Sequence, residues 1–143
     1  MRLAADTDDV NLCVTFDWEM GHRLPNHEGA CFNLHGHHYV LQVYLAGTVN
    51  KTTGSPSEGM VIDFQDVKQN VKWILADYYD HKFLISNTDA LAEEMSRLPG
   101  VILVDYIPTA ENIALQLKRD LKPHIPQMVA LRLYETPGCY AEV

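Results

Sequence analysis

Two stretches of alternating apolar and polar residues dominate the first third of the chain, and histidine lies at one end of each. In the first stretch, apolar side chains recur at every second position from Val10 to Trp18, and His22 follows shortly after. The second stretch runs from about His37 to Ala46 and is rich in β-branched and aromatic residues. Such alternation predicts β-strands with one buried face, so we expect the chain to build on a sheet.

The segment from Cys31 to His37 carries two imidazoles that are separated only by Gly36. Side chains at positions i and i+2 of a strand share a face, so His35 and His37 are placed to bind one metal ion. His22 offers a third imidazole, and three neutral imidazoles with an open fourth position form the ligand set of a catalytic zinc. The alternative is a pair of exposed histidines at a strand end.

Composition and length exclude several classes of protein. The 143 residues fit a single domain, residues 1–143, and the 47% hydrophobic and 21% charged content is typical of a soluble globular protein. A formal net charge of -8 argues against nucleic acid partners. No apolar run reaches the roughly 20 residues of a membrane span, and residues 1–6 lack the apolar core of a signal peptide. We therefore expect a cytoplasmic protein that has no membrane partner. Because its three cysteines are scattered along the sequence, we also expect their thiols to be reduced.

The rest of the chain shows helical periodicity and shorter strand patterns. Asp63 is an expected N-cap, and the apolar residues after it recur at helical spacing from 64 to 78. Thr109 is expected to cap a second main helix, at 110–122, which Pro123 and Pro126 end. Shorter elements are expected at four further places, a helix at 89–97 and strands at 101–104, 129–135 and 139–142.

The order of these elements predicts an α+β fold. Two main helices would cover one face of an antiparallel, four-stranded sheet, and Trp18 and Trp73 are expected in the core between the layers. The uncovered face and the sheet edges would then require a partner, which oligomerisation commonly provides.

Four further residues, at three places in the chain, carry reactive side chains, and each place has a structural alternative. Cys31 lies in a polar loop beside the metal candidates, where positive charge would stabilise a thiolate, although a free cysteine is also a common small core residue. Asp80 and His81 follow the first main helix, where a histidine also interacts favourably with the helix dipole. Glu135 ends an alternating run, where a solvated strand end is the alternative.

These residues belong to an ordered series of motifs that resembles the 6-pyruvoyltetrahydropterin synthase and 6-carboxytetrahydropterin synthase family. The resemblance covers about residues 10 to 142. The motifs in chain order are His22-Arg23-Leu24, Cys31-x3-His35-Gly36-His37, Gly59 to Phe64, Asp80-His81, Pro108-Thr109-x-Glu111-Asn112 and Glu135-Thr136.

The resemblance implies an architecture and a role for each motif. The architecture is a tunnelling fold (T-fold), in which trimers close their sheets into a barrel, two trimers stack into a homohexamer, and active sites lie at subunit interfaces. The implied zinc ligands are His22, His35 and His37. The implied proton-transfer groups are Cys31, as the thiol that abstracts a proton, and the pair Asp80 and His81. The implied substrate contacts are Glu135, which would anchor the pterin ring, and Thr109 and Glu111 near the pterin pocket.

The resemblance also implies a substrate, 7,8-dihydroneopterin triphosphate. Three residues separate Cys31 from His35, as in the bacterial carboxy-forming branch of the family. This spacing favours conversion to 6-carboxy-5,6,7,8-tetrahydropterin with release of acetaldehyde and triphosphate, on the route to queuosine and other 7-deazapurines. The alternatives are the pyruvoyl-forming reaction, which eliminates triphosphate, and a non-catalytic, zinc-stabilised pterin-binding module. Candidates for contacting the triphosphate are Arg23, Lys51, Lys82 or a residue of a neighbouring subunit.

Overall fold

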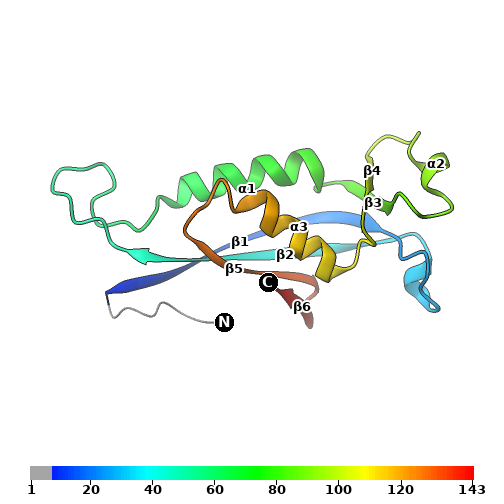
Figure 1. Ribbon diagram of the computed structural model, residues 1–143, viewed down its shortest axis with the longest axis horizontal. Helices are drawn as coiled ribbons and strands as arrows, with labels where there is room; N and C mark the ends of the chain where they lie inside the picture. Colours follow the sequence, from blue (N-terminus) through cyan, green and yellow to red (C-terminus); the bar gives the residue numbers. More distant parts are fainter. Residues whose placement is uncertain (1–7) are drawn as a thin grey trace.

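The computed structural model describes residues 8–143, and in this range helices lie across one face of a six-stranded sheet (Figure 1). The strands are β1 (Asp9–His22), β2 (His35–Thr48), β3 (Lys82–Ser86), β4 (Val101–Val104), β5 (Met128–Thr136) and β6 (Cys139–Glu142). The helices are α1 (Phe64–Tyr78), α2 (Ala92–Met95) and α3 (Ala110–Leu121), and a 3₁₀ turn, η1 (Ala30–Phe32), lies between β1 and β2. Residues 1–6, on which the expectation about a signal peptide rests, lie outside the described range.

β1 and β2 form a long antiparallel hairpin that carries both alternating stretches of the sequence. The strands pair along their whole length, and the register sets His22 opposite His35 and Gly21 opposite Gly36. The buried side chains of β1 recur at every second position and end at His22, which is itself buried. The histidines therefore continue the same face of the hairpin that forms the hydrophobic core.

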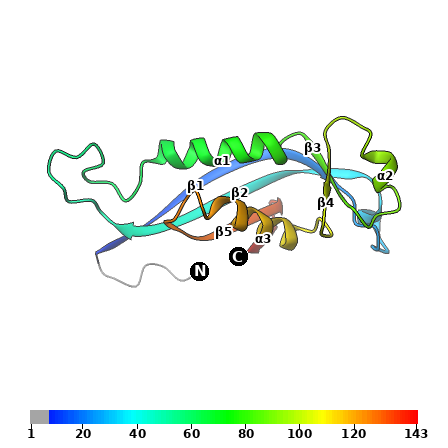
Figure 2. The ribbon, with the colours of Figure 1, turned by 45° about the horizontal axis from the view of Figure 1, so that its top comes forward.

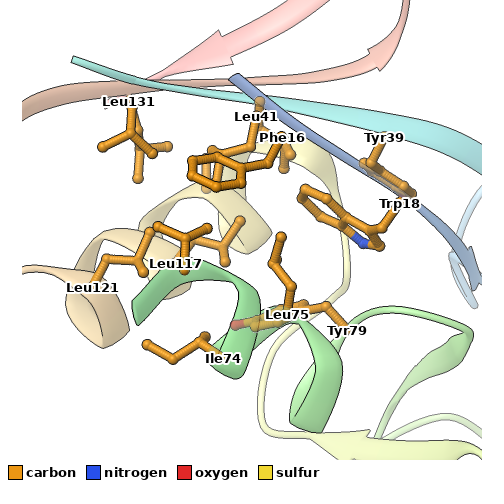
Figure 3. Packing of buried hydrophobic residues seen from close by; sticks show 14 of the residues in the cluster. Phe16, Trp18, Tyr39, Leu41, Ile74, Leu75, Tyr79, Leu117, Leu121 and Leu131 are labelled. Carbon is orange, nitrogen blue, oxygen red and sulfur yellow. The ribbon is translucent and has the colours of Figure 1, made fainter. Parts of the chain in front are cut away.

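The core lies between the hairpin and the two main helices, α1 and α3 (Figures 2 and 3). Trp18 stacks on Tyr39 of the neighbouring strand, with 5.7 Å between the ring centroids. Burial of each large apolar side chain in such a layer contributes roughly 1.5–3 kcal/mol. The buried residues that the helices add to the core are Val67, Val71, Ile74, Leu75, Ile113, Ala114, Leu117 and Leu121.

Both main helices begin where the sequence predicts. The side chain of Asp63 accepts a hydrogen bond from the backbone N–H of Gln65, and that of Thr109 accepts one from Asn112. The prediction for Trp73 is wrong, because this residue of α1 is 55% exposed. No helix within residues 8–143 is both long and apolar enough to cross a bilayer.

The α+β fold class is confirmed, and the sheet is larger than the four strands expected. Its strand order is β4-β3-β1-β2-β5-β6, in which β1, β2, β5 and β6 pair antiparallel. β3 and β4 extend the sheet in parallel beside β1. α2 is also shorter than the helix expected at 89–97, because the Asp89 side chain accepts the backbone N–H of Leu91 and holds a turn there.

The close approach of the strands at Gly21 leads to a prediction about stability. A Cβ atom at this position would lie 2.5 Å from Cδ2 of Phe83 in β3 and 3.2 Å from the carbonyl oxygen of His35. We expect Gly21→Ala to lower the free energy of unfolding by about 1–3 kcal/mol, measured by chemical denaturation. The matched control is Gly138→Ala, whose Cβ would meet no atom within 4 Å. Equal stability of the two variants would contradict this account of Gly21.

Candidate active site

The structure brings the three predicted metal-binding histidines together at one end of the hairpin. The ring centroid of His22 lies 4.5 Å from that of His35 and 5.1 Å from that of His37, and the last two are 5.0 Å apart. One ligand atom of each side chain lies within 4.8 Å of the others. Nitrogen ligands of a tetrahedral zinc ion lie about 3.4 Å apart, so the three side chains converge as such an ion requires.

Backbone carbonyls orient two of these imidazoles. Nδ1 of His22 lies 2.7 Å from the carbonyl oxygen of Pro108, and Nδ1 of His35 lies 2.8 Å from that of Asn33. Since a carbonyl only accepts, each Nδ1 carries the hydrogen, and in a neutral imidazole this leaves a lone pair on Nε2. The two Nε2 atoms are 2.9 Å apart, and two facing lone pairs fit a cation between them.

Burial supports the neutral form that metal binding needs. His22 is fully buried, and this burial lowers the pKa of its imidazole, against an opposing hydrogen bond to Pro108. Nε2 of His37 is also buried and makes no hydrogen bond with any of residues 8–143, and Oε1 of Glu135 lies 3.4 Å away. Three imidazoles whose ligand nitrogen atoms lie close together match the ligand preference of zinc, so the residues present fit this metal.

Glu135 connects the histidine cluster with a cavity of about 330 Å³. Thr109 and Glu111 also line this cavity, so the three predicted substrate contacts lie around one space beside the metal candidates. Thr109 comes from the start of α3, where its hydroxyl caps the helix, and Glu135 comes from the end of β5. The cavity has the size of a small-molecule site.

Cys31 lies on the short turn η1, between the two strands that carry the histidines. Its side chain is free, and the residue is half-buried. Its carbonyl accepts a hydrogen bond of 3.0 Å from the N–H of Leu24, which lines the Glu135 cavity. The same turn leads directly into Asn33, whose carbonyl orients His35, so one short segment of chain holds both the thiol and one of the metal candidates.

Asp80 and His81 form a pair that lies apart from Cys31. Nδ1 of His81 is 2.7 Å from Oδ1 of Asp80, and the His81 side chain is 78% exposed. His81 has a φ of 57°, an uncommon value for a residue other than glycine, and its N–H donates to the carbonyl of Glu19. It lines a second cavity of about 300 Å³ together with His37 and Lys82. The described contacts of residues 8–143 do not join this pair to Cys31.

Sequence reasoning missed two features around this site. The first is the carbonyl partner of His22, because every residue carries a carbonyl and Pro108 has no distinguishing signal for this role. The second is the ion pair between Nε of Arg23 and Oδ2 of Asp89, which are 3.1 Å apart. It neutralises one of the three cations considered for the triphosphate.

The sheet with helices on one face defines a tunnelling-fold protein, and the three-histidine cluster at the end of its long hairpin could hold a metal ion. The family model for 6-pyruvoyl tetrahydropterin synthase matches residues 11–143, and the chain belongs to this family. The resemblance inferred from the motif series is thus confirmed.

Relatives of known name agree with this membership. The chain is 39% identical over 136 residues to a 6-carboxy-5,6,7,8-tetrahydropterin synthase of Rickettsia typhi, covering 89% of this chain and 94% of the relative. A synthase of the same name from Haemophilus influenzae is 37% identical over 134 residues, covering 89% and 93%. The structure of Caenorhabditis elegans 6-pyruvoyl tetrahydropterin synthase matches with a TM-score of 0.71 and 24% identity, covering 100% and 97% of the two chains. The chain is therefore an enzyme of the pterin synthase type, with lyase-type activity.

Proposed function

We propose that this enzyme converts 7,8-dihydroneopterin triphosphate and one water molecule to 6-carboxy-5,6,7,8-tetrahydropterin, acetaldehyde and triphosphate. The observation that carries the proposal is the placement of Glu135, which lies 3.4 Å from the imidazole of His37 and also lines the cavity with Thr109 and Glu111. A ligand in this cavity would contact the carboxylate and the metal candidates at once. The names of the two bacterial relatives support the carboxy-forming product.

Glu135 is proposed to fix the pterin ring. A carboxylate accepts two hydrogen bonds side by side, and the amidine-like edge of a pterin offers two matching donors. This contact would orient the ring and direct its side chain toward the histidine cluster, since Glu135 lies between the cavity and His37.

Zinc is the proposed cofactor, held by His22, His35 and His37. When bound, it would supply a Lewis acid that acidifies the neighbouring C–H of the substrate side chain and stabilises the negative charge that develops there. Cys31 would then act as the base that removes this proton, because a thiolate is a far better base than the neutral thiol. The three imidazoles would remain neutral, consistent with the lowered pKa of His22.

The second proton transfer is assigned to His81, with Asp80 orienting its ring through the 2.7 Å contact at Nδ1. Because this pair is exposed and makes no described contact with Cys31, we propose that a neighbouring copy in a homohexamer brings the two parts together. Of the three cations considered for the triphosphate, Lys82 is favoured, since it lines the same cavity as His81. Arg23 is already paired with Asp89.

The proposed setting is the cytoplasm, where the product would enter queuosine or 7-deazapurine synthesis. The test is to incubate the zinc-loaded protein with 7,8-dihydroneopterin triphosphate and to identify the products by mass. We expect a carboxytetrahydropterin and acetaldehyde. A pyruvoyltetrahydropterin would replace this assignment with the other reaction of the family, and unchanged substrate bound to the protein would indicate a pterin-binding module.

A further inference from the structure

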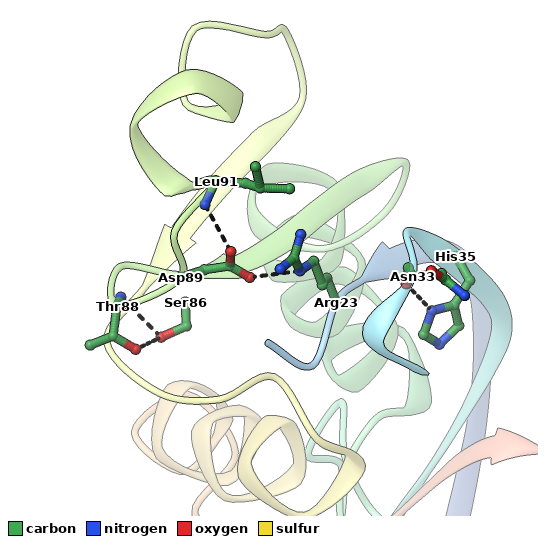
Figure 4. Close-up of polar contacts among 7 residues, drawn as sticks. All are labelled: Arg23, Asn33, His35, Ser86, Thr88, Asp89 and Leu91. Carbon is green, nitrogen blue, oxygen red and sulfur yellow. Dashed lines mark hydrogen bonds and ion pairs between the residues drawn. The ribbon is translucent and has the colours of Figure 1, made fainter. Parts of the chain in front are cut away.

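A buried ion pair links the first metal candidate to the segment between β3 and α2 (Figure 4). Arg23 directly follows His22, and its Nε atom lies 3.1 Å from Oδ2 of Asp89. Arg23 is only 8% exposed and Asp89 only 5%. Two charges are costly to remove from water, and in some proteins such a pair serves to hold one specific arrangement.

Asp89 is itself held firmly. Its Oδ1 atom accepts the N–H of Leu91 at 2.9 Å, and its own N–H donates to the carbonyl of Ser86 at 3.0 Å. The hydroxyl of Ser86 in turn contacts that of Thr88 at 2.8 Å (Figure 4). One carboxylate oxygen is therefore bound within the turn, and the other is directed at Arg23.

On its other side, Arg23 contacts the turn that carries Cys31. The guanidinium carbon lies 4.5 Å from the centre of the Phe32 ring, which is a cation–π contact. Phe32 is the next residue after Cys31 and is 45% exposed, so the fold does not depend on burying its ring. Leu24, the residue after Arg23, donates its N–H to the Cys31 carbonyl. Phe32 is thus in contact with Arg23 itself, and the Cys31 carbonyl with the residue after Arg23.

We propose that Asp89 is a positioning residue for Cys31, acting through Arg23 and Phe32. The Asp89 carboxylate holds the Arg23 guanidinium, and the guanidinium holds the ring of Phe32. The ring in turn fixes the turn that carries the Cys31 thiol. The proposal rests on the proposed function, in which Cys31 is the base. A base must stay within hydrogen-bond reach of the proton it removes, and a displacement of about 1 Å can reduce a rate by about 100-fold.

The decisive variants are Asp89→Asn, which removes the charge and keeps the shape, and Phe32→Leu, which removes the ring at an exposed position. We expect Asp89→Asn to lower kcat by about 10- to 100-fold with little change in KM. Phe32→Leu is expected to lower kcat by only about 2- to 5-fold, because the hydrogen bond from Leu24 to the Cys31 carbonyl still connects the turn to the residue after Arg23. Because both act through one chain of contacts, the double variant should be no slower than Asp89→Asn alone. Phe32→Tyr keeps the aromatic face and should restore kcat to within about twofold of the original value.

A second measurement follows the turn directly and needs no turnover. The amides of Leu24, Phe32 and Asn33 are hydrogen-bonded within this turn, so their hydrogen exchange reports its order. We expect exchange in residues 24–34 to become at least about 10-fold faster in Asp89→Asn, while exchange in β5 stays unchanged. The matched control is Glu93→Gln, which breaks the exposed ion pair with Arg97 on the same segment and should alter neither kcat nor exchange.

The possible failures are distinguishable. An Asp89→Asn protein with unchanged kcat and unchanged exchange in the turn would overturn the proposal. A loss of zinc in this variant would also overturn it, because the residue would then act on the metal ligands rather than on Cys31. If the original protein makes no product, the proposed function fails, and the exchange experiment still decides whether Asp89 holds the turn.

Discussion

Cys31→Ala is expected to lower kcat by about 10²- to 10⁴-fold, the usual contribution of a positioned acid or base. Cys31 lies on η1, between the two strands that carry the histidines, and is not one of the three grouped metal candidates. Removing its thiol should therefore abolish proton abstraction and leave zinc binding intact. The measurements are steady-state kinetics with 7,8-dihydroneopterin triphosphate and zinc content determined on the same preparation.

The control for this variant is Cys13→Ala. Cys13 is an exposed thiol in the middle of β1, outside the cavities around the site, so its loss should leave kcat and zinc content unchanged. If Cys31→Ala retained more than about a tenth of the original kcat, the role of general base would be refuted. If both variants lost activity equally, the effect would reflect thiol loss in general rather than the position of Cys31.

The fold was most predictable where one periodic pattern decided the structure. Alternation placed β1 and β2, and because it continued into His22 and His35, it also placed the metal candidates on the buried face. The capping residues Asp63 and Thr109 located the starts of both main helices. β3 was missed because its five residues do not alternate between apolar and polar, and three consecutive side chains in it are buried. Its partner strand, β1, is also far away in the sequence, so no local pattern indicates the pairing.

The sequence predicted the reactive side chains of the site better than it predicted the groups that orient those side chains. Imidazoles two residues apart signal their chemistry directly, whereas the carbonyls of Pro108 and Asn33 that orient them have no sequence signature. Asp89 likewise appeared as part of a short helix, because nothing near it in the sequence indicates a partner as distant as Arg23. Trp73 shows a different error, because an aromatic residue on a helix is expected in the core, whereas here the side chain is exposed.

His22→Ala is expected to weaken zinc binding by more than about 100-fold, because even the loss of a group that only orients a ligand costs 10- to 100-fold. Zinc that binds only the folded state raises its stability, by about 2.7 kcal/mol when free zinc is at 100 times its Kd. We therefore expect added zinc to raise the melting temperature of the original protein and to leave that of the variant unchanged. His124→Ala, at an exposed histidine outside the cluster, should respond to zinc like the original protein.

Comparison with His35→Ala separates loss of metal from loss of fold. His22 is fully buried, and its removal leaves a void and deprives the Pro108 carbonyl of its donor, which costs about 1–3 kcal/mol even without metal. His35 is only partly buried at the strand end, so its removal should cost the metal-free protein much less. Both variants should lose the response to zinc, and only His22→Ala should melt clearly lower in the presence of a chelator. A normal response to zinc in either variant would refute that histidine as a ligand.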